Sequence, residues 1–367
     1  MSEILRRTFD EFGQSPWLDN LQRSYITSGK LAELISSGVR GLTSNPTIFQ
    51  KAIQGSDDYD DQFTAEIRNG ATPLEAYWSL VIKDINDALD VFADLYSSSS
   101  GLDGFVSVEV DPRLAKDGEK TLTAARDLDE RINRSNVMIK IPATEEGLPA
   151  IEQMISEGRN VNVTLIFSLQ RYQQVMDAYV GGLEARAARG LDISSIQSVA
   201  SFFISRVDNE IDELLNKDGS PEALGLRGKS AIAQARLAYA LFQTTFSGER
   251  WDKLSALGAS VQRPLWASTS TKNPSYPDTL YVDELIGPMT VNTIPEATLN
   301  AFAEHGNPSR SIDMNVAAAV DVWKSLREYG VNVDDVARKL EREGVASFIK
   351  SFEELVDALN EKASSLN

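Results

Sequence analysis

Short apolar segments typical of buried β-strands recur along this 367-residue chain, and helical stretches fill the gaps between them. Runs of apolar or β-branched residues bounded by turn residues mark the candidate strands. They lie at residues 17–20, 39–43, 105–110, 137–141, 161–167, 198–203, 264–268 and 289–294. This alternation of strand and helix constrains the fold more than any other feature, because it favours a parallel sheet covered by helices.

The number of strand–helix units selects between two parallel-sheet architectures. Eight units predict an α/β fold of the (β/α)8 TIM barrel type. A doubly wound open sheet is the alternative, and counting strands alone leaves it open. The glycine-rich nucleotide turns G-x-G-x-x-G and G-x-x-x-x-G-K-[ST] are absent from the sequence, which weakens that alternative.

Helical patterns predict the rest of the architecture. A capping box with proline at the first helical position opens a helix at Thr72 that extends to Tyr96. No low-complexity linker or repeat divides the chain, so we expect residues 1–367 to form a single barrel domain. Residues from about 310 to 367 are expected to form helical C-terminal elements packed on it, ending in an amphipathic helix that contains Phe348 and Phe352.

Composition narrows the chemistry. The chain has no cysteine and a single histidine, which excludes disulfides, cysteine zinc sites and multi-histidine metal sites. The net charge of −18 argues against binding to nucleic acid or to an anionic membrane. No apolar run approaches the roughly 20 residues of a membrane span, and residues 1–7 do not resemble a signal peptide. We therefore expect a soluble, cytoplasmic protein whose acid–base chemistry uses carboxylates, lysine, tyrosine or water.

Polar residues fall late in successive predicted strands, where a barrel enzyme keeps its active site. Because side chains alternate along a strand, Glu109 and Lys140 are expected to point into the barrel, away from their apolar neighbours. The same position in other strands is occupied by Asp19, Thr43, Ser44, Asn45, Asn162, Thr164, Ser201 and the run from Ser268 to Lys272.

Lys140 has two interpretations. An inward lysine is costly to bury as a cation, so its pKa should fall, and a neutral amine in a dry pocket is a Schiff-base nucleophile. A lone lysine between two isoleucines is more often an edge-strand residue that faces water. The occurrence of polar residues at the same end of successive strands favours the inward, catalytic interpretation.

Other polar features have simpler interpretations when each is considered alone. Asn45 before a proline is a turn or helix-start signal, and residues 268–271 read as a loop. His305 lies at a predicted helix C-terminus followed by glycine, where a cation interacts well with the helix dipole, so we expect a structural role. The aspartates of residues 57–61 are interpreted as a solvated helix start rather than a metal loop.

Four segments together resemble the signature segments of transaldolase, in its long bacterial form with an extended C-terminal helical region. They are GLTSNPT at residues 41–47, VEVDPR at 108–113, VMIKIPAT at 137–144 and NVTLIFS at 162–168. The resemblance implies a (β/α)8 barrel of the class I aldolase type, with the Schiff-base lysine on the fourth strand and no metal or organic cofactor. It also implies transfer of a dihydroxyacetone unit from sedoheptulose 7-phosphate to glyceraldehyde 3-phosphate, which yields erythrose 4-phosphate and fructose 6-phosphate in the non-oxidative pentose phosphate pathway.

The same resemblance implies roles for individual residues. Lys140 would form the Schiff base, Glu109 would relay protons through a water held by Thr164, and Asp19 would take the proton of the C4 hydroxyl. The residues expected to bind hydroxyls of the three-carbon unit are Thr43, Asn45, Asn162 and Ser201. Phe203 would line the pocket and keep out water.

The phosphate group of the substrate needs cationic or hydroxyl donors on the loops after late strands. Arg206 and Ser268 match the family's phosphate contacts. The chain departs from the pattern of shorter transaldolases at Ser270, where they have an arginine, and we expect Lys272 to supply that charge instead.

Two other functions stay open on the sequence. One is an aldolase that releases free dihydroxyacetone, against which Phe203 in place of a tyrosine proton donor is a one-residue argument. The other is a non-catalytic sugar-phosphate-binding barrel, which would not need Lys140, Glu109 and Asp19 together. A cofactor-dependent oxidoreductase lacks any dinucleotide loop. The expected partners are sugar phosphates, and the chain is expected to be a monomer or a homodimer.

Overall fold

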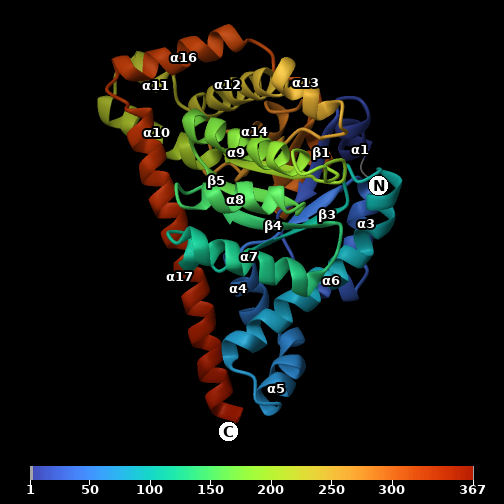
Figure 1. Ribbon diagram of the computed structural model, residues 1–367. Helices are drawn as coiled ribbons and strands as arrows, with labels where there is room; N and C mark the ends of the chain where they lie inside the picture. Colours follow the sequence, from blue (N-terminus) through green and yellow to red (C-terminus); the bar gives the residue numbers. More distant parts are fainter. Residues whose placement is uncertain (1–2, 367) are drawn as a thin grey trace.

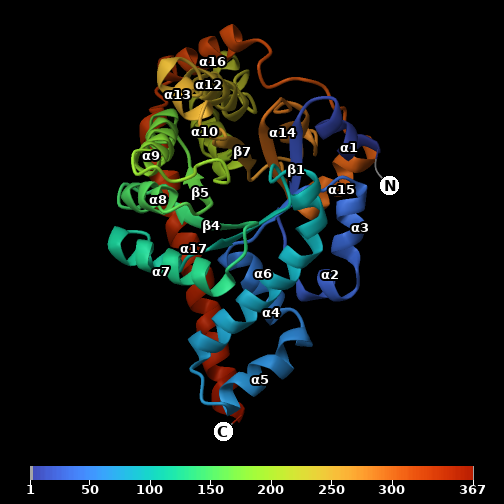
Figure 2. The same cartoon turned by 45° about the vertical axis from the view of Figure 1, so that its right-hand side comes forward.

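The computed structural model describes residues 3–366 and contains a closed barrel of parallel strands in the order β1 to β8. The TIM barrel prediction is therefore confirmed, and the open sheet is excluded. Figures 1 and 2 show the strands at the centre with helices around them. The strands are β1 (Gln14–Leu18), β2 (Gly41–Thr43), β3 (Phe105–Glu109), β4 (Val137–Pro142), β5 (Val161–Ile166), β6 (Ser198–Phe203), β7 (Arg263–Ala267) and β8 (Thr290–Ile294).

The predicted strands agree with these bounds to within two residues at each end except at the start of β1, which begins three residues earlier than expected; β1 also ends at Leu18 rather than Asn20. The first residues of β1 are polar, so a search for apolar runs did not include them. Gln14 is fully buried; its side-chain NH2 group donates to the Leu285 carbonyl and to Thr290, and its Oε1 has no hydrogen-bond partner among the described residues. The backbone N–H of Asp19 still donates to the Ile294 carbonyl at 3.0 Å, so the pairing of β1 with β8 extends to Asp19.

Large and charged side chains together fill the barrel interior. The Trp17 ring lies against β2 and is fully buried, and a Cβ atom on Gly41 would lie 2.4 Å from that ring. Glycine at position 41 is therefore required by the close approach of the indole. At the N-terminal end of the strands, Arg263 is buried with Asp103 at 3.2 Å and with the Ser15 hydroxyl at 3.0 Å, so this cation is paired.

Helices cover the barrel on all sides and add elements at both ends of the chain. The predicted capping box at Thr72 is present and opens α6. The α-helices are α1 (Glu3–Asp10), α2 (Arg23–Thr27), α3 (Lys30–Ser37), α4 (Pro46–Gln54), α5 (Asp60–Arg68), α6 (Pro73–Ser98), α7 (Gly118–Ile132), α8 (Gly147–Ser156), α9 (Leu169–Ala187), α10 (Ser205–Asp218), α11 (Pro221–Leu224), α12 (Ser230–Thr245), α13 (Glu249–Ser255), α14 (Leu280–Asp283), α15 (Glu296–His305), α16 (Val316–Glu328) and α17 (Val333–Leu366), and two 3-10 helices span Asp57–Tyr59 and Pro112–Leu114.

The terminal helix α17 is the longest helix described and runs along the molecule past α10, α7 and α4 toward α5 (Figure 1). Its apolar face is buried as predicted, with Phe348 and Phe352 almost completely covered. The Ser351 and Thr47 hydroxyls lie 2.8 Å apart and join α17 to α4, and Lys362 pairs with Asp60 near the far end of the helix. Residue 367 of the predicted C-terminal region lies outside the described residues. That the whole chain forms one domain stays a prediction.

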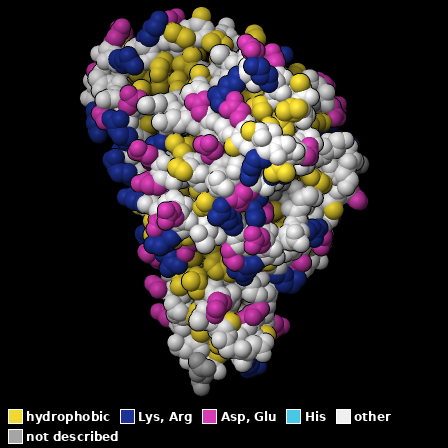
Figure 3. All heavy atoms as spheres, in the orientation of Figure 1, with side chains coloured by type: hydrophobic (Ala, Val, Ile, Leu, Met, Phe, Trp, Pro, Cys, Tyr) yellow, Lys and Arg dark blue, Asp and Glu magenta, His cyan; other side chains and the backbone are white. Residues whose placement is uncertain are grey.

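The molecular surface mixes the two signs of charge. Figure 3 shows acidic and basic side chains interspersed over one face, with small apolar areas between them. Within residues 3–366, no helix has both the length and the apolar character needed to cross a membrane.

Candidate active site

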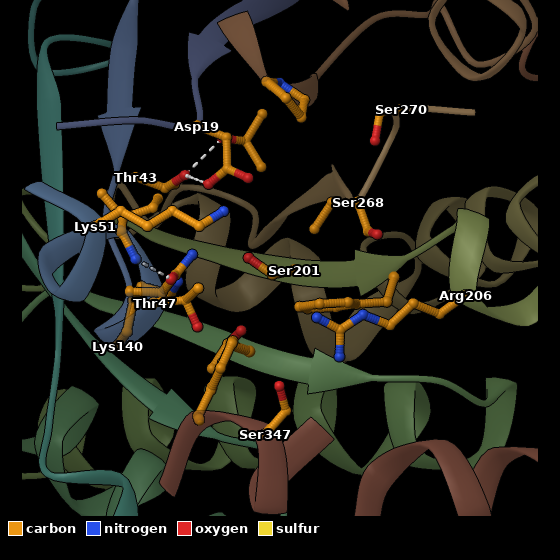
Figure 4. Close-up of a pocket in the computed structure, with 18 of the residues that line it drawn as sticks. Asp19, Thr43, Thr47, Lys51, Lys140, Ser201, Arg206, Ser268, Ser270 and Ser347 are labelled. Carbon is orange, nitrogen blue, oxygen red and sulfur yellow. Dashed lines mark hydrogen bonds between the residues drawn. The ribbon is translucent and has the colours of Figure 1, made fainter. Parts of the chain in front are cut away.

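A cavity of about 360 Å³ opens at the C-terminal end of the barrel strands. Most of the residues singled out from the sequence meet around it, although they come from six of the eight strands or from the segments directly after them (Figure 4). Those that line it are Asp19, Thr43, Asn45, Lys140, Thr164, Ser201, Phe203, Arg206, Ser268 and Lys272, whereas Glu109 and Asn162 lie directly beneath its floor.

Strand register places Lys140 between Glu109 and Asn162. Glu109 of β3 pairs with Lys140 of β4, which in turn pairs with Asn162 of β5. The Lys140 ammonium lies 3.4 Å from a Glu109 carboxylate oxygen and donates to the Ser44 carbonyl at 2.9 Å. Both side chains are more than nine-tenths buried, so Lys140 does not face water at a sheet edge. The inward orientation predicted from side-chain alternation is confirmed.

Glu109 and Thr164 each have a buried polar atom without a protein hydrogen-bond partner among the described residues. These atoms are Glu109 Oε2, whose nearest cation is Lys140, and Thr164 Oγ1. Burial raises the pKa of Glu109, and the nearby Lys140 charge offsets part of that rise. Buried oxygens of this kind normally satisfy their hydrogen bonds with water or ligand atoms, so this part of the floor is suited to exchange protons with either.

Asp19, directly after β1, is held in place by a chain of threonine hydroxyl groups. It accepts a hydrogen bond from the Thr43 hydroxyl at 2.8 Å, and the Thr43 oxygen lies 2.6 Å from that of Thr293. Because Thr43 has one hydroxyl proton and gives it to Asp19, Thr293 must be the donor to Thr43. Burial raises the pKa of Asp19 despite the Lys140 charge and the hydrogen bond from Thr43, so this carboxylate is a stronger base than an exposed aspartate.

Asn45 fulfils the helix-start interpretation and also lines the cavity. Its side-chain oxygen accepts from the Ile48 N–H at 3.0 Å as the N-cap of α4, and Pro46 occupies the first helical position. The cap uses only the oxygen of the amide. The amide NH2 group therefore remains as the donor that Asn45 can offer to a ligand in the cavity.

Asn162 lies in the middle of a chain of hydrogen bonds that joins Ser201 to Ser107. Its NH2 group donates to Ser107 Oγ at 3.0 Å, and its oxygen accepts from Ser201 Oγ at 2.7 Å. Ser201 itself lines the cavity. Asn162 is fully buried, so in this structure it orients Ser201 rather than facing the cavity directly.

Two non-glycine residues at the cavity have left-handed backbone conformations. Leu165, directly after Thr164, has φ of 61° at a point where the pairing of β5 with β6 shifts register. Ser268, directly after β7, has φ of 58°. Such conformations cost free energy and gather at functional sites, and bulges redirect neighbouring side chains. Here they turn the chain at the two strand ends that present Thr164 and the hydroxyl of Ser268.

The cations of the site lie beside β6 and β7. The Arg206 guanidinium lies over the Phe203 ring, 5.1 Å from its centroid, and has no ion pair within the described part of the chain. Burial lowers its pKa, and the charges of Asp19 and Glu109 oppose this shift. Lys272 is exposed at the cavity edge, where its ammonium donates to Ser270 Oγ at 2.7 Å. Ser268 lies 3.0 Å from Ser205 through their hydroxyl oxygens.

Several residues that line the cavity were not predicted as site residues by the sequence analysis: Thr47, Lys51, Thr293, Ser347 and Phe348. Thr47 and Lys51 are four residues apart on α4, on the helix face that follows Asn45, and this spacing could have revealed them. Ser347 and Phe348 come from α17 (Figure 4). No local pattern could place them, because a terminal helix can dock on many parts of a barrel.

The features expected to be structural lie outside the cavity lining. His305 ends α15, is exposed, and has its pKa raised by a hydrogen bond and by the charge of Asp278. The acidic residues 57–61 form the 3-10 turn and the start of α5, as expected of a helix start. Across residues 3–366, no cluster of three or more acidic or histidine side chains is arranged to hold a metal ion.

Comparison with known proteins agrees with this geometry. The family model described as "Transaldolase/Fructose-6-phosphate aldolase" matches residues 16–359. A protein named Transaldolase from Parafrankia sp. is 52% identical over 355 residues, which is 96% of each chain. Proteins of the same name from Trichodesmium erythraeum and Saccharopolyspora erythraea are 48% and 52% identical over 97% and 95% of this chain, and over the same shares of their own length.

Proposed function

The chain belongs to the transaldolase/fructose-6-phosphate aldolase family, and from this premise we propose that it is a transaldolase acting through a Schiff base on Lys140. It transfers a dihydroxyacetone unit from sedoheptulose 7-phosphate to glyceraldehyde 3-phosphate and produces erythrose 4-phosphate and fructose 6-phosphate. The observation that carries the proposal is the Lys140 amine, which is buried inside the cavity with Glu109 at 3.4 Å and is reachable from the opening.

The first half of the reaction joins Lys140 to the ketose. The neutral amine attacks the C2 carbonyl and forms a carbinolamine, which loses its hydroxyl group as water and becomes an iminium ion. A proton must reach that hydroxyl before it leaves. Glu109 supplies it through a water that also contacts Thr164, an arrangement supported by the unpartnered oxygens of both residues and by the raised pKa of Glu109.

The second half breaks and remakes a carbon–carbon bond. Asp19 takes the proton of the C4 hydroxyl, the C3–C4 bond breaks, and its electron pair moves to the iminium to form an enamine on Lys140. The aldehyde product leaves, and the enamine attacks the aldehyde carbon of the acceptor while Asp19 returns the proton to the new hydroxyl. This attack regenerates the iminium ion on Lys140, and water hydrolyses it to release fructose 6-phosphate and the free amine. The raised pKa of Asp19 and its hydrogen bond from Thr43 support this role.

The substrate phosphate is bound on the opposite side of the cavity from Lys140. Arg206, Ser268 and Lys272 provide two cations and a hydroxyl there, and Figure 4 shows Arg206, Ser268 and Ser270 across the cavity from Asp19 and Lys140. Thr43, Asn45 and Ser201 contact hydroxyls of the three-carbon unit, with Asn162 orienting Ser201.

An aldolase that releases free dihydroxyacetone is the second candidate, because the matching family model covers both activities. The cavity wall at the end of β6 favours transfer. Phe203 lines the cavity there, packed against Phe167 with ring centroids 5.1 Å apart, and its ring cannot donate a proton to the enamine. An enamine that is not protonated persists until an acceptor aldehyde arrives.

Trapping the covalent intermediate tests the central proposal. The protein is incubated with fructose 6-phosphate, reduced with borohydride, and mapped by mass spectrometry. We expect a three- or six-carbon adduct on Lys140 and none in the matched Lys140→Arg variant, which keeps the charge but not the nucleophile. An adduct on another lysine, or no adduct on a protein that is folded by circular dichroism, would contradict the proposal.

A second assay separates transfer from release. Cleavage of fructose 6-phosphate is measured with and without erythrose 4-phosphate as acceptor. A transaldolase should turn over rapidly only when the acceptor is present. Comparable cleavage without acceptor would identify the aldolase.

A further inference from the structure

The segment between β7 and β8 carries Ser268, Ser270 and Lys272 to the cavity, and little holds its exposed part in place. Lys272 bonds only to Ser270, which is two residues away on the same segment. The segment is attached at its beginning, where Ser268 accepts the Ser205 N–H at its carbonyl and Thr269 donates to the Asn292 side chain at 2.9 Å. Its second attachment therefore decides where Lys272 lies.

That second attachment is Tyr276, four residues after Lys272. Its hydroxyl donates to the Asp212 carboxylate of α10, and Asp212 also accepts the Gly228 N–H at 3.1 Å. The Tyr276 ring rests on Gly228, where a Cβ atom would come within 2.8 Å of the ring. Gly228 also has φ of 69°, so glycine suits both the backbone and the close approach of the ring. Both ends of the Tyr276 side chain are therefore fixed, the ring by packing on Gly228 and the hydroxyl by its hydrogen bond to Asp212.

A second tyrosine repeats the arrangement one helical turn earlier on α10. The Tyr281 hydroxyl donates to Asp208 at 2.8 Å, and Asp208 also accepts the Ala231 N–H at 2.7 Å. Asp208 and Asp212 are four residues apart, so they lie on the same face of α10. Both connect the β7–β8 segment to the same helix that carries Arg206 in its first turn.

We propose that Tyr276 and Asp212 are positioning residues for phosphate recognition, which fix Lys272 at the distance from Arg206 that one phosphate group requires. The inference rests on the proposed function, because it assigns the support for its phosphate subsite. Arg206 is held by α10, and Tyr276 ties the loop that carries Lys272 to that same helix. Helix and loop then form one unit that presents two cations to the ligand in a preorganised geometry.

Removing the hydrogen bond between Tyr276 and Asp212 should weaken phosphate binding without changing the chemistry at Lys140. In Tyr276→Phe the ring stays packed on Gly228 while the hydrogen bond to Asp212 is lost. We expect KM for fructose 6-phosphate and for erythrose 4-phosphate to rise about three- to ten-fold, the effect of one typical hydrogen bond. The value of kcat should change by less than about two-fold, and adduct formation with unphosphorylated dihydroxyacetone should not change.

The matched control is Tyr239→Phe, which removes a hydroxyl that donates to the Pro288 carbonyl at 3.0 Å and does not line the cavity. It should leave KM unchanged. If both variants raise KM equally, or if Tyr276→Phe slows adduct formation with dihydroxyacetone as well, Tyr276 has only a general structural role and the proposal is wrong.

A double-mutant cycle distinguishes positioning from general stabilisation. If Tyr276 acts through Lys272, adding Tyr276→Phe to Lys272→Ala should raise KM little further. Independent, additive effects of the two substitutions would overturn the proposal. The dissociation constant of inorganic phosphate, measured by calorimetry, gives the same comparison without turnover. The inference can therefore fail while Lys140 forms its adduct and transfer proceeds, and it can hold even if the assigned reaction is wrong.

Discussion

The two sides of the cavity are built in different ways. On the side of β1 to β5, Asp19, Glu109 and Lys140 sit on or directly after strands and are held by short contacts with the barrel itself. On the side of β6 and β7, Arg206 lies on a helix and Lys272 on an exposed loop. Lys140 is 5% exposed, whereas Lys272 is exposed and bonds only to a near neighbour in sequence.

This difference corresponds to what each side must do. Bond making and breaking require groups held within fractions of an ångström and shielded from water. Recognition of a phosphate at the far end of the sugar depends mainly on charge, and here that charge is placed by a loop that the Tyr276–Asp212 hydrogen bond joins to α10. We therefore expect substitutions on the strand side to reduce kcat and substitutions on the loop side to raise KM.

The largest effect should come from Asp19→Asn. It removes the proposed base for C3–C4 cleavage, so kcat for transfer should fall by about 10²- to 10⁴-fold, the range for a general base. Adduct formation with dihydroxyacetone needs no such cleavage and should persist, which borohydride trapping measures. Equal loss of both activities would mean that Asp19 supports Lys140 rather than the cleavage step.

Glu109→Gln should reduce both transfer and adduct formation, by about 10²-fold, because the relay serves the formation of the iminium ion. Since burial raises the pKa of Glu109 and the proposed relay uses its protonated form, the wild-type rate of adduct formation should have an alkaline limb, a fall in rate as pH rises, at a pH above the usual pKa range of a glutamate. A pH–rate profile of trapping checks this. The limb should vanish in Glu109→Gln, and an unchanged profile in the variant would assign it to another group.

Lys272→Ala should raise KM for fructose 6-phosphate about ten-fold with little change in kcat, through loss of one charge-assisted contact. Lys51→Ala is the matched control, because Lys51 also lines the cavity and has no ion pair within the described residues. It lies on the side of Asp19 and Lys140 (Figure 4). Steady-state kinetics of both variants should show the larger KM effect for Lys272. The reverse order would place the phosphate beside α4.

The smallest effect on activity is expected at Asp208, whose buried side chain has its pKa raised to about 7 by burial. Between the usual aspartate pKa and pH 7 the folded state holds a proton that the unfolded state has lost, so stability falls as pH rises through this window. Asp208→Asn removes that titration. Relative to the wild type its stability should rise with pH across the window, by at most about 1.4 kcal/mol per pH unit.

Urea unfolding at several pH values from 5 to 8 measures this difference. Asp61→Asn is the control, because Asp61 is exposed at the start of α5 and should leave the pH dependence unchanged. If the free energy of unfolding of Asp208→Asn depends on pH as that of the wild type does, another group causes the pH dependence.

Much of the fold and of the strand side of the site could be predicted from local patterns. The alternation around Glu109 and Lys140 correctly predicted that both point inward, because one face of a buried strand must carry its polar residues. The start of β1 was missed because Gln14 is polar yet buried inside the barrel, where its NH2 group donates to the Leu285 carbonyl. The position of Lys272 was predicted only as a charge near Ser268, since a loop has no periodicity from which to read its direction.

The sequence by itself determined the strand–helix alternation and the inward orientation of Glu109 and Lys140, because hydrophobic periodicity and strand alternation are local properties. Closure of the sheet into a barrel was decided by the tertiary structure. The tertiary structure alone decided which surfaces meet. It placed Ser347 and Phe348 of α17 in the cavity wall, buried Asn162 beneath Ser201, and joined Tyr276 to Asp212. Those contacts link residues far apart along the chain and depend on packing between whole elements, which no local pattern encodes.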